Sequence, residues 1–283
     1  MKILLLDDYS GLFKNLRSGL LKNGHQVTFI ATGDGWKEID GMDIKINSSD
    51  AGIYGKLIRR LQVLWHLRKM KGYDAVLLIN QSFLFRGISS LMIWYLYKNN
   101  NSVFLSACGG DVPYAEFGTM GGFKAKHWPH EGIKDHKPIN KYLKPFNKRL
   151  HLKLCENLAG VIPICYEYAL SWRNSDQASL LLATIPSPIN VSEIQPSYLD
   201  PKKKKITFFH GLNREGCKGT SFITEAMNNM AKKYPNEIEI IIDGKMSLEK
   251  YLNLLASVDV VIDQCKGYTY SSMNTLYAMA LGK

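Results

Sequence analysis

The sequence predicts an α/β protein made of two Rossmann-like, doubly wound domains that face each other. Short apolar segments with the length of buried strands alternate with segments whose apolar residues recur at helical spacing. This alternation runs twice, and a proline-rich segment at residues 185–201 separates the two series. The 283 residues, 46% of them hydrophobic, are enough for two cores. We therefore expect one domain over residues 1–185 and a second over residues 186–283.

The first series contains five apolar segments that we expect to be strands. They lie at residues 2–6, 25–31, 75–79, 102–107 and 160–164. A helical pattern at 12–23 separates the first two, and Gly24 marks its end, since glycine readily adopts the left-handed conformation that follows many helices. A second helical pattern, with basic flanks, covers 141–158.

The second series predicts strands at 206–209, 238–242 and 258–262. Helical patterns follow them, at 221–233, 248–256 and 273–281. Because strands alternate with helices, both sheets are expected to be parallel. Such sheets bind ligands at the carboxyl ends of their strands, so we expect a ligand between the two domains.

A glycine-rich turn at residues 210–219 joins a predicted strand to a predicted helix and carries Arg214 and Lys218. Free N–H groups and the positive end of the helix dipole favour an anion at a helix start. The turn therefore predicts a phosphate site to which Arg214 and Lys218 add full charges. The alternative is a surface turn with solvated cations, because the spacing matches neither the Walker motif nor GxGxxG.

Two turns in the first series are further candidates. Ser10 and Gly11 follow the first strand, where their N–H groups could meet a phosphate or an acceptor, although an ordinary capped turn explains them equally well. Asp111 follows the strand at 102–107 and could act as a catalytic base or orient a sugar hydroxyl. The alternative for Asp111 is a carboxylate that caps the next helix.

The net charge of +11 implies an anionic partner: nucleic acid, an acidic membrane surface or a phosphorylated small molecule. Residues 55–71 place several apolar side chains, among them Leu57, Leu61 and Trp65, at near-helical spacing among cations. This segment could lie on an anionic bilayer. Alternatively it packs its apolar side on the sheet and leaves its cations in water. We expect no nucleic-acid binding, since no aromatic and basic surface motif is present.

The remaining composition points to a cytoplasmic protein. The five cysteines are scattered, with no spacing typical of a disulfide framework or a zinc site. The apolar start at residues 1–6 is too short for a signal peptide, and the apolar stretch at 83–97, which Arg86 interrupts, is too short for a membrane span. We expect neither a metal nor another cofactor in the site.

Eight phrases of the sequence resemble the GT-B glycosyltransferases of the family 4 type, which are found in bacterial surface-polysaccharide clusters. The phrases are DDYSG at 7–11, GHQV at 24–27, GDGWK at 33–37, HGLNR at 210–214, KGT at 218–220, DQC at 263–265, SMNTL at 272–276 and AMALGK at 278–283. They span nearly the whole chain. The resemblance implies a retaining transfer of a sugar from a nucleotide-sugar donor to a glycan or lipid-linked acceptor, at the inner face of the cytoplasmic membrane.

The resemblance also assigns residues. Arg214 and Lys218 would hold the pyrophosphate of the donor and stabilise the leaving nucleoside diphosphate, where fixed cations help most. Ser272 and Asn274 would lie beside the donor sugar or nucleotide. Thr269 and Tyr277 occupy the positions where the family carries two glutamates, and neither can supply a carboxylate.

Two alternatives follow from these departures. Loss of both carboxylates would suit a non-catalytic relative that only binds a sugar nucleotide or polysaccharide. The family also continues beyond the equivalent of Lys283, so we expect the second domain to be incomplete here.

Overall fold

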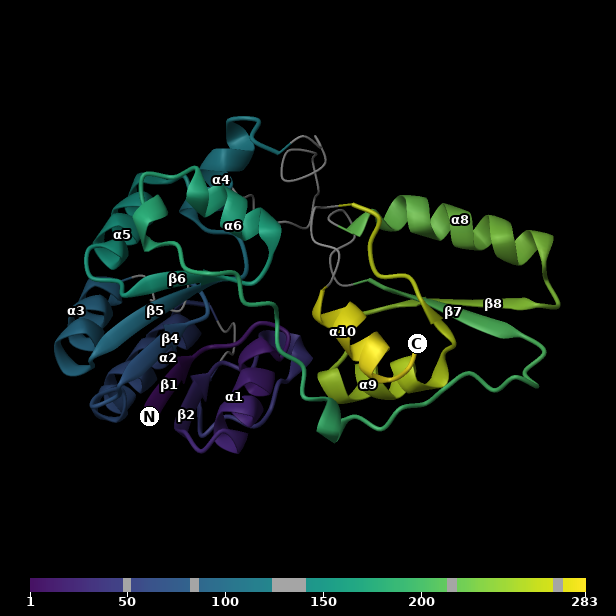
Figure 1. Ribbon diagram of the computed structural model, residues 1–283, viewed down its shortest axis with the longest axis horizontal. Coiled ribbons are helices and arrows are strands. Elements are labelled where there is room, and N and C mark those ends of the chain that lie inside the picture. The colour runs from purple at the N-terminus through teal and green to yellow at the C-terminus, as the bar shows by residue number, and fades with distance from the viewer. Residues whose placement is uncertain (48–51, 82–86, 124–140, 213–217, 267–271) are drawn as a thin grey trace. The chain divides into compact units, whose positions relative to one another are not determined.

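The computed structural model describes residues 1–47, 52–81, 87–123, 141–212, 218–266 and 272–283 (Figure 1). The chain divides into two compact units. Among the described residues, unit 1 contains Met1–Phe123 and Lys141–Pro188, and unit 2 contains Ile189–Lys283. The division at 188/189 falls in the proline-rich segment, three residues after the expected one. The predicted turn residues Arg214 and Thr269 lie outside the described residues.

Unit 1 is built on a six-stranded parallel sheet. Its strands are β1 (Lys2–Leu6), β2 (Gln26–Ala31), β3 (Ile44–Lys45), β4 (Ala75–Leu78), β5 (Ser102–Ala107) and β6 (Gly160–Pro163). Their order, β3-β2-β1-β4-β5-β6, is that of the dinucleotide-binding fold. All five predicted strands of this unit are present. The sixth, β3, has two residues, too few for any apolar alternation to appear in the sequence.

In the part of unit 1 that the structure describes, six α-helices lie between or after these strands. They are α1 (Leu12–Lys22), α2 (Gly52–His66), α3 (Ser89–Asn99), α4 (Val112–Thr119), α5 (Pro145–Cys155) and α6 (Tyr166–Arg173). Helix α1 ends as predicted, because Gly24 adopts a φ of 77° and its N–H donates to the Leu21 carbonyl at 3.0 Å. The basic helix expected at 141–158 is shorter and starts at Pro145, a residue suited to the first helical position.

Unit 2 has a three-stranded parallel sheet in the order β8-β7-β9. The strands are β7 (Ile206–Gly211), β8 (Ile238–Asp243) and β9 (Val260–Val261), and the helices are α8 (Thr220–Lys233), α9 (Leu248–Ser257) and α10 (Met273–Ala280). Short 3-10 helices lie in the connections of both units: η1 (Gly35–Lys37), η2 (Leu67–Lys69), η5 (Ala178–Leu180) and η6 (Val191–Glu193).

The two faces of the second sheet are covered differently (Figure 1). Phe209 on β7 is fully buried in a cluster with Tyr251 and Leu255 of α9 and Tyr277 of α10. Its neighbour Phe208 points to the opposite face, as alternation along a strand requires. Helices thus flank both faces of this sheet, and two doubly wound parallel sheets confirm the predicted fold class.

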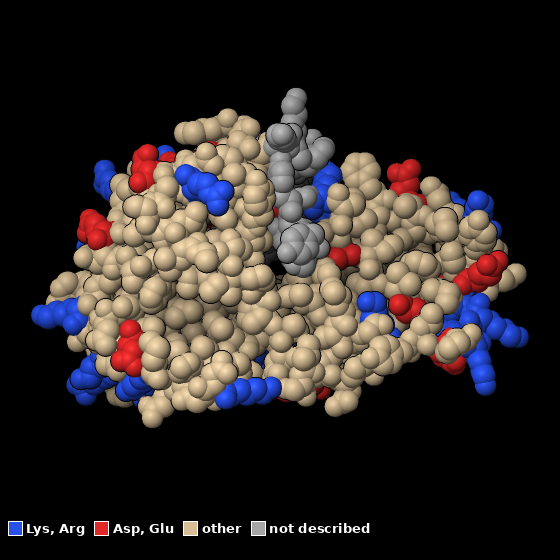
Figure 2. All heavy atoms as spheres, viewed as in Figure 1, with Lys and Arg blue, Asp and Glu red and all other residues tan. Residues whose placement is uncertain are grey.

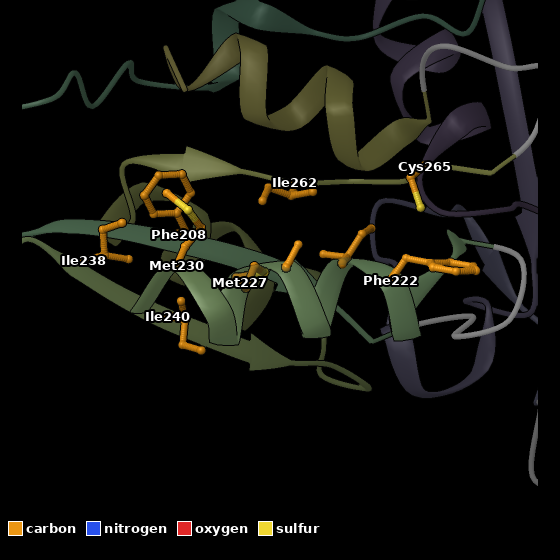
Figure 3. A pocket seen from close by; sticks show the side chains of 10 residues that line it. Phe208, Phe222, Met227, Met230, Ile238, Ile240, Ile262 and Cys265 are labelled. Carbon is orange, nitrogen blue, oxygen red and sulfur yellow. The ribbon is translucent and has the colours of Figure 1, made fainter. Parts of the chain in front are cut away.

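On the Phe208 side, a cavity of about 360 Å³ lies between α8 and the sheet (Figure 3). Its lining is apolar and consists of Phe208, Phe222, Ile223, Ala226, Met227, Met230, Ile238, Ile240, Ile262 and Cys265. A nucleotide phosphate would lose its hydration there without gaining a charged or hydrogen-bonding partner. The polar site of unit 2 lies elsewhere.

Candidate functional site

The topology of unit 2 marks one place for a ligand. From β7 the chain passes through α8 to β8 on one side, and then returns through α9 to β9 on the other side of β7. The strand order therefore reverses between β7 and β9. In open parallel sheets, ligands bind outside the carboxyl ends of the strands at such a switch point.

An ion pair between Lys218 and Asp263 occupies this switch point. Lys218 follows β7 and is 7% exposed, and the side chain of Asp263, which follows β9, is 10% exposed. The second carboxylate oxygen of Asp263 accepts hydrogen bonds from the hydroxyls of Ser272 at 2.5 Å and Thr275 at 2.8 Å. One carboxylate thus connects the loop after β7, the loop after β9 and the start of α10.

The contacts of Asp263 keep it ionised. Burial raises its pKa, but the charge of Lys218 and the hydrogen bonds from Lys218, Ser272 and Thr275 outweigh burial and lower the pKa below its usual value. The ammonium of Lys218 has three N–H groups, of which Asp263 takes one. A phosphate oxygen could therefore be bound by Lys218 while Asp263 holds the cation in place.

Two helices begin at the same network. Ser272 is the N-cap of α10, and its hydroxyl accepts from the N–H of Asn274 at 3.1 Å while donating to Asp263. Gly219 is the N-cap of α8 and follows Lys218 directly. The starts of helices of 14 and 8 residues carry partial positive charge, so both favour an anion here.

Gly219 is required at its position. Its φ of 74° lies in the left-handed region, and an added Cβ would lie 2.5 Å from Sγ of Cys265. The N–H of Cys265 donates to the carbonyl of Lys218 at 3.0 Å, which draws the loops after β7 and β9 together. Any side chain at 219 would push these loops apart and move Lys218 away from Asp263.

His210, at the end of β7, supports the same arrangement. It is fully buried, with Nδ1 2.8 Å from the carbonyl oxygen of Ile262 and Nε2 2.8 Å from the hydroxyl of Thr220. A carbonyl can only accept, so Nδ1 carries the proton, and in the neutral ring Nε2 accepts from Thr220. Burial lowers the pKa of His210 and favours this neutral form. The ring therefore ties β7 to β9 and to the first turn of α8.

The predicted site residues of unit 2 lie in two different places. Lys218, Ser272 and the backbone of Asn274 share one hydrogen-bond network around Asp263. Tyr277 instead lies in the hydrophobic core, 4% exposed, where packing explains it. Asp263 and Thr275 were not predicted, although an aspartate directly after an apolar strand and a Ser-x-x-Thr helix start were visible signals.

The switch point of unit 1 lies between β1 and β4, and carboxylates occupy it. Asp8 accepts hydrogen bonds from the N–H groups of Phe13 at 2.9 Å and Lys14 at 3.3 Å, at the start of α1. Asp34, paired with Lys37, accepts from the N–H of Ser10 at 2.9 Å. The N–H of Ser10, expected to meet a phosphate, is therefore already bonded to a carboxylate.

Burial changes the acidity of this region. It raises the pKa of Asp8 to about 7 and also raises that of Asp7, whose carboxylate accepts from the N–H and hydroxyl of Thr32. Asn80, which follows β4, donates to the carbonyl of Gly110 at 3.1 Å and so joins the loops after β4 and β5. Gly11, the N-cap of α1 with a φ of 83°, lies at the same edge of the sheet. The loops at this edge offer hydrogen-bond acceptors and carboxyl groups. The edge therefore suits a sugar hydroxyl better than a phosphate.

Asp111 is buried, and both its oxygens have partners. One accepts from the N–H of Tyr114 at 2.8 Å, which caps α4, and the other accepts from the indole N–H of Trp172 at 2.8 Å. Burial raises the pKa of Asp111 to about 6. These contacts favour the capping role over the catalytic role, because a base must reach a substrate proton.

Among the described residues, no group of three or more His, Cys, Asp or Glu residues is arranged to hold a metal ion. None of the described helices is both long enough and apolar enough to cross a membrane.

Comparisons with known proteins concern the fold. No protein-family model and no curated protein match the sequence. Similar solved structures include the apo form of the lipopolysaccharide outer core galactosyltransferase WaaB, at 15% identity and a TM-score of 0.40, covering 95% of this chain and 69% of that one. The catalytic domain of starch synthase IV from Arabidopsis thaliana, bound to ADP and acarbose, has 10% identity, coverage of 99% and 76%, and a TM-score of 0.48.

A third similar structure is UDP-GlcNAc 2-epimerase from Neisseria meningitidis bound to UDP-GlcNAc. It has 14% identity, coverage of 99% and 75%, and a TM-score of 0.46. The names comprise a galactosyltransferase, a starch synthase and an epimerase, so a likeness in fold leaves the reaction open.

Proposed function

We propose that this chain binds a nucleotide-sugar donor at the switch point of unit 2 and transfers the sugar to a glycan or lipid-linked acceptor. The observation that carries the proposal is the Lys218–Asp263 pair at the starts of α8 and α10. A buried cation held beside two helix starts is suited to a diphosphate. The preceding turn also carries Arg214, which would add a second cation.

The same groups would assist the reaction. Negative charge on the leaving nucleoside diphosphate grows as the glycosidic bond breaks, so a fixed cation stabilises the transition state more than the ground state. Asp263 orients Lys218, and His210 keeps the loops in register. Retention of configuration, a metal-independent site, a role in bacterial surface-polysaccharide synthesis and a cytoplasmic location belong to this proposal through the resemblance to family 4 glycosyltransferases.

The carboxyl-lined edge of unit 1 would serve the acceptor. Ser10 and Gly11 would then approach a sugar hydroxyl, while Asp8, which is buried and accepts from the N–H groups of Phe13 and Lys14, would hold the start of α1 in place. Asp111 would act indirectly, by holding α4 and Trp172 in place.

A second candidate is a non-catalytic relative that binds a sugar nucleotide without transferring the sugar. The burial of Tyr277 favours it, because a core tyrosine stands where the family has a glutamate. Release of nucleoside diphosphate from a nucleotide-sugar distinguishes the two functions. The enzyme would release it, slowly to water and faster with an acceptor, whereas the non-catalytic relative would bind the donor and leave it intact.

Isothermal titration with UDP, GDP and ADP, at low and moderate salt, tests the binding step common to both. The test variant is Lys218→Met with Asp263→Asn, which removes the ion pair and leaves the net charge unchanged. We expect binding of one nucleotide to weaken about tenfold or more in this variant, since a charged hydrogen bond is lost. Lys250→Ala, an exposed cation on α9, is the control. Equal affinity in the ion-pair variant would remove Lys218 from the site.

A further inference from the structure

Helix α2 turns its most apolar side away from the core of unit 1. Only Gly55 and Val63 of its fifteen residues are buried. Trp65 is 82% exposed and Leu61 is 56% exposed. The exposed apolar side chains follow helical spacing along one side: Ile53, Tyr54, Leu57, Ile58, Leu61 and Trp65. The helix therefore packs on the core through its Gly55 and Val63 side, and these six apolar side chains stay outside that packing.

Helix α3 extends the same surface. Met92, Ile93 and Leu96 enter the core, which leaves Leu91 and Trp94 exposed on the other side. The two helices are neighbours, because an added Cβ at Gly87, just before α3, would lie 3.5 Å from the guanidinium carbon of Arg60 on α2. We name the outward sides of these helices, together with η2 and Lys71, the α2–α3 face.

The charge of this face has one sign. Residues 52–73 and 87–101 contain no aspartate or glutamate. They contain seven cations, of which Lys56, Arg68, Lys69, Lys71 and Lys98 are exposed; Arg60 is half-buried, and Arg59 is half-buried with its Nε donating to the Asn47 carbonyl at 3.3 Å. Lys98 lies over the ring of Trp94, with Nζ 5.1 Å from the ring centroid. Figure 2 shows Lys and Arg spread over both units; several lie at the edge of unit 1 where Figure 1 draws α3, with a few acidic residues nearby.

Exposed apolar side chains beside cations fit an anionic bilayer better than a second copy of the chain or a nucleic acid. Aliphatic side chains and tryptophans beside cations are typical of helices that lie in the headgroup region of an anionic bilayer. A second copy in a two-fold dimer would set the same cations against one another, which costs binding energy. Nucleic acid would use the cations but would leave Ile53, Leu57 and Leu61 without a partner.

We propose that the α2–α3 face binds the surface of an anionic lipid bilayer. Leu61, Trp65 and Trp94 lie at the level of the headgroups, and the cations pair with lipid phosphates. The α2–α3 face belongs to unit 1, so binding of a bilayer does not depend on the nucleotide site of unit 2. The binding is peripheral and weakens as salt screens the cations.

Co-sedimentation with vesicles tests the proposal. One set contains equal parts of phosphatidylglycerol and phosphatidylcholine, and the other contains phosphatidylcholine alone. We expect binding to the anionic vesicles to be at least tenfold tighter and to fall with added salt. The Leu61→Ser, Trp65→Ser variant is expected to bind at least tenfold more weakly. Val191→Ser with Met279→Ser, which changes two exposed apolar residues of unit 2, is expected to bind like the unchanged chain.

A second pair of variants tests how much the cations of the α2–α3 face contribute to vesicle binding. Arg68→Gln, Lys69→Gln, Lys71→Gln removes three exposed cations of the face, and Lys202→Gln, Lys204→Gln, Lys205→Gln removes three exposed cations of unit 2. Both lower the net charge equally. We expect about a 100-fold loss of vesicle binding for the first, at about fivefold for each cation, and little loss for the second.

Several outcomes would overturn the proposal. Failure of the unchanged chain to sediment with anionic vesicles would do so, as would equal losses in the two triple variants, which would show attraction by net charge alone. A concentration-dependent dimer in sedimentation velocity that Leu61→Ser, Trp65→Ser abolishes would assign the face to a second copy. Nucleotide titration of the same samples separates these results from a failure of the donor site.

Discussion

Each unit has its own topological switch point, and the side chains differ between the two: carboxyl groups lie at the one in unit 1, and a cation paired with a carboxylate lies at the one in unit 2. In unit 1, Asp8 and Asp34 accept hydrogen bonds from backbone N–H groups around the start of α1. In unit 2, Lys218 stands beside the starts of α8 and α10, held by Asp263. The order of the strands therefore decides where a ligand crevice forms, and the few side chains after each strand decide which ligand it accepts.

The strongest test of this contrast is removal of the cation in unit 2. Lys218→Met leaves the carboxylate of Asp263 buried without its partner, and we expect the free energy of unfolding to fall by about 3 to 5 kcal/mol. Four of the five tryptophans, Trp36, Trp65, Trp94 and Trp172, lie in unit 1, so in a Trp128→Phe background fluorescence follows unit 1, and far-ultraviolet circular dichroism follows both units. During urea unfolding, the circular dichroism should show an early transition that the fluorescence lacks.

The matched control adds Asp263→Asn to Lys218→Met. It removes the unpaired charge but keeps an acceptor for Ser272 and Thr275, and it should recover most of the lost stability. If the double variant were as unstable as the single variant, loss of packing rather than an unpaired charge would be the cause.

The units should also respond to pH in opposite directions. Burial raises the pKa of Asp8 to about 7 and that of Asp111 to about 6, so folded unit 1 keeps protons that the unfolded chain has lost above about pH 4. The stability of unit 1 should therefore rise as the pH falls from about 7 toward 4, by up to about 1.4 kcal/mol per pH unit for each group.

In unit 2 the dependence of stability on pH has the opposite sign. The pKa of Asp263 is lowered, so its stabilising contribution is complete above the ordinary aspartate pKa and is lost as the pH falls through the folded value. Thermal unfolding from pH 7 to 3, followed by fluorescence and by circular dichroism, measures both trends. Asp8→Asn should remove the part of the unit 1 trend centred near pH 7, and parallel trends in both signals would contradict the contrast.

A smaller effect is expected for the second predicted cation. Arg214→Ala should weaken nucleoside diphosphate binding by about 1.5 to 3 kcal/mol, which is about 10- to 150-fold, through loss of a charged hydrogen bond. Asp8→Asn, made at the other switch point, should leave the affinity unchanged. Tighter binding in Asp8→Asn together with unchanged binding in Arg214→Ala would move the phosphate site to unit 1.

The smallest effect concerns the cap of α10. Ser272→Ala removes the acceptor for the N–H of Asn274 and a donor to Asp263, and should cost about 1 to 2 kcal/mol of stability. Ser247→Ala is the control, because Ser247 caps α9 by accepting from Lys250 and has no bond to Asp263. Equal losses in the two variants, measured by urea unfolding, would show that the hydroxyl of Ser272 acts only as a cap.

Local patterns were enough to predict most of the fold. Apolar runs and helical spacing located every strand except β3, and Gly24 marked the end of α1, because these signals depend on residues close together in the chain. The glycine-rich turn with Lys218 was visible for the same reason. Its partner Asp263 is 45 residues away, and only the placement of β9 beside β7 brings the two together.

What the sequence by itself determined is the alternation of strands and helices and the positions of their ends. The tertiary structure alone decided which groups meet: Ser10 with Asp34, Tyr277 with the core, and Asp111 with Trp172. It also decided that the apolar side of α2 points outward. Periodicity shows that a helix has an apolar side, but whether that side is covered depends on neighbours that the chain brings from elsewhere.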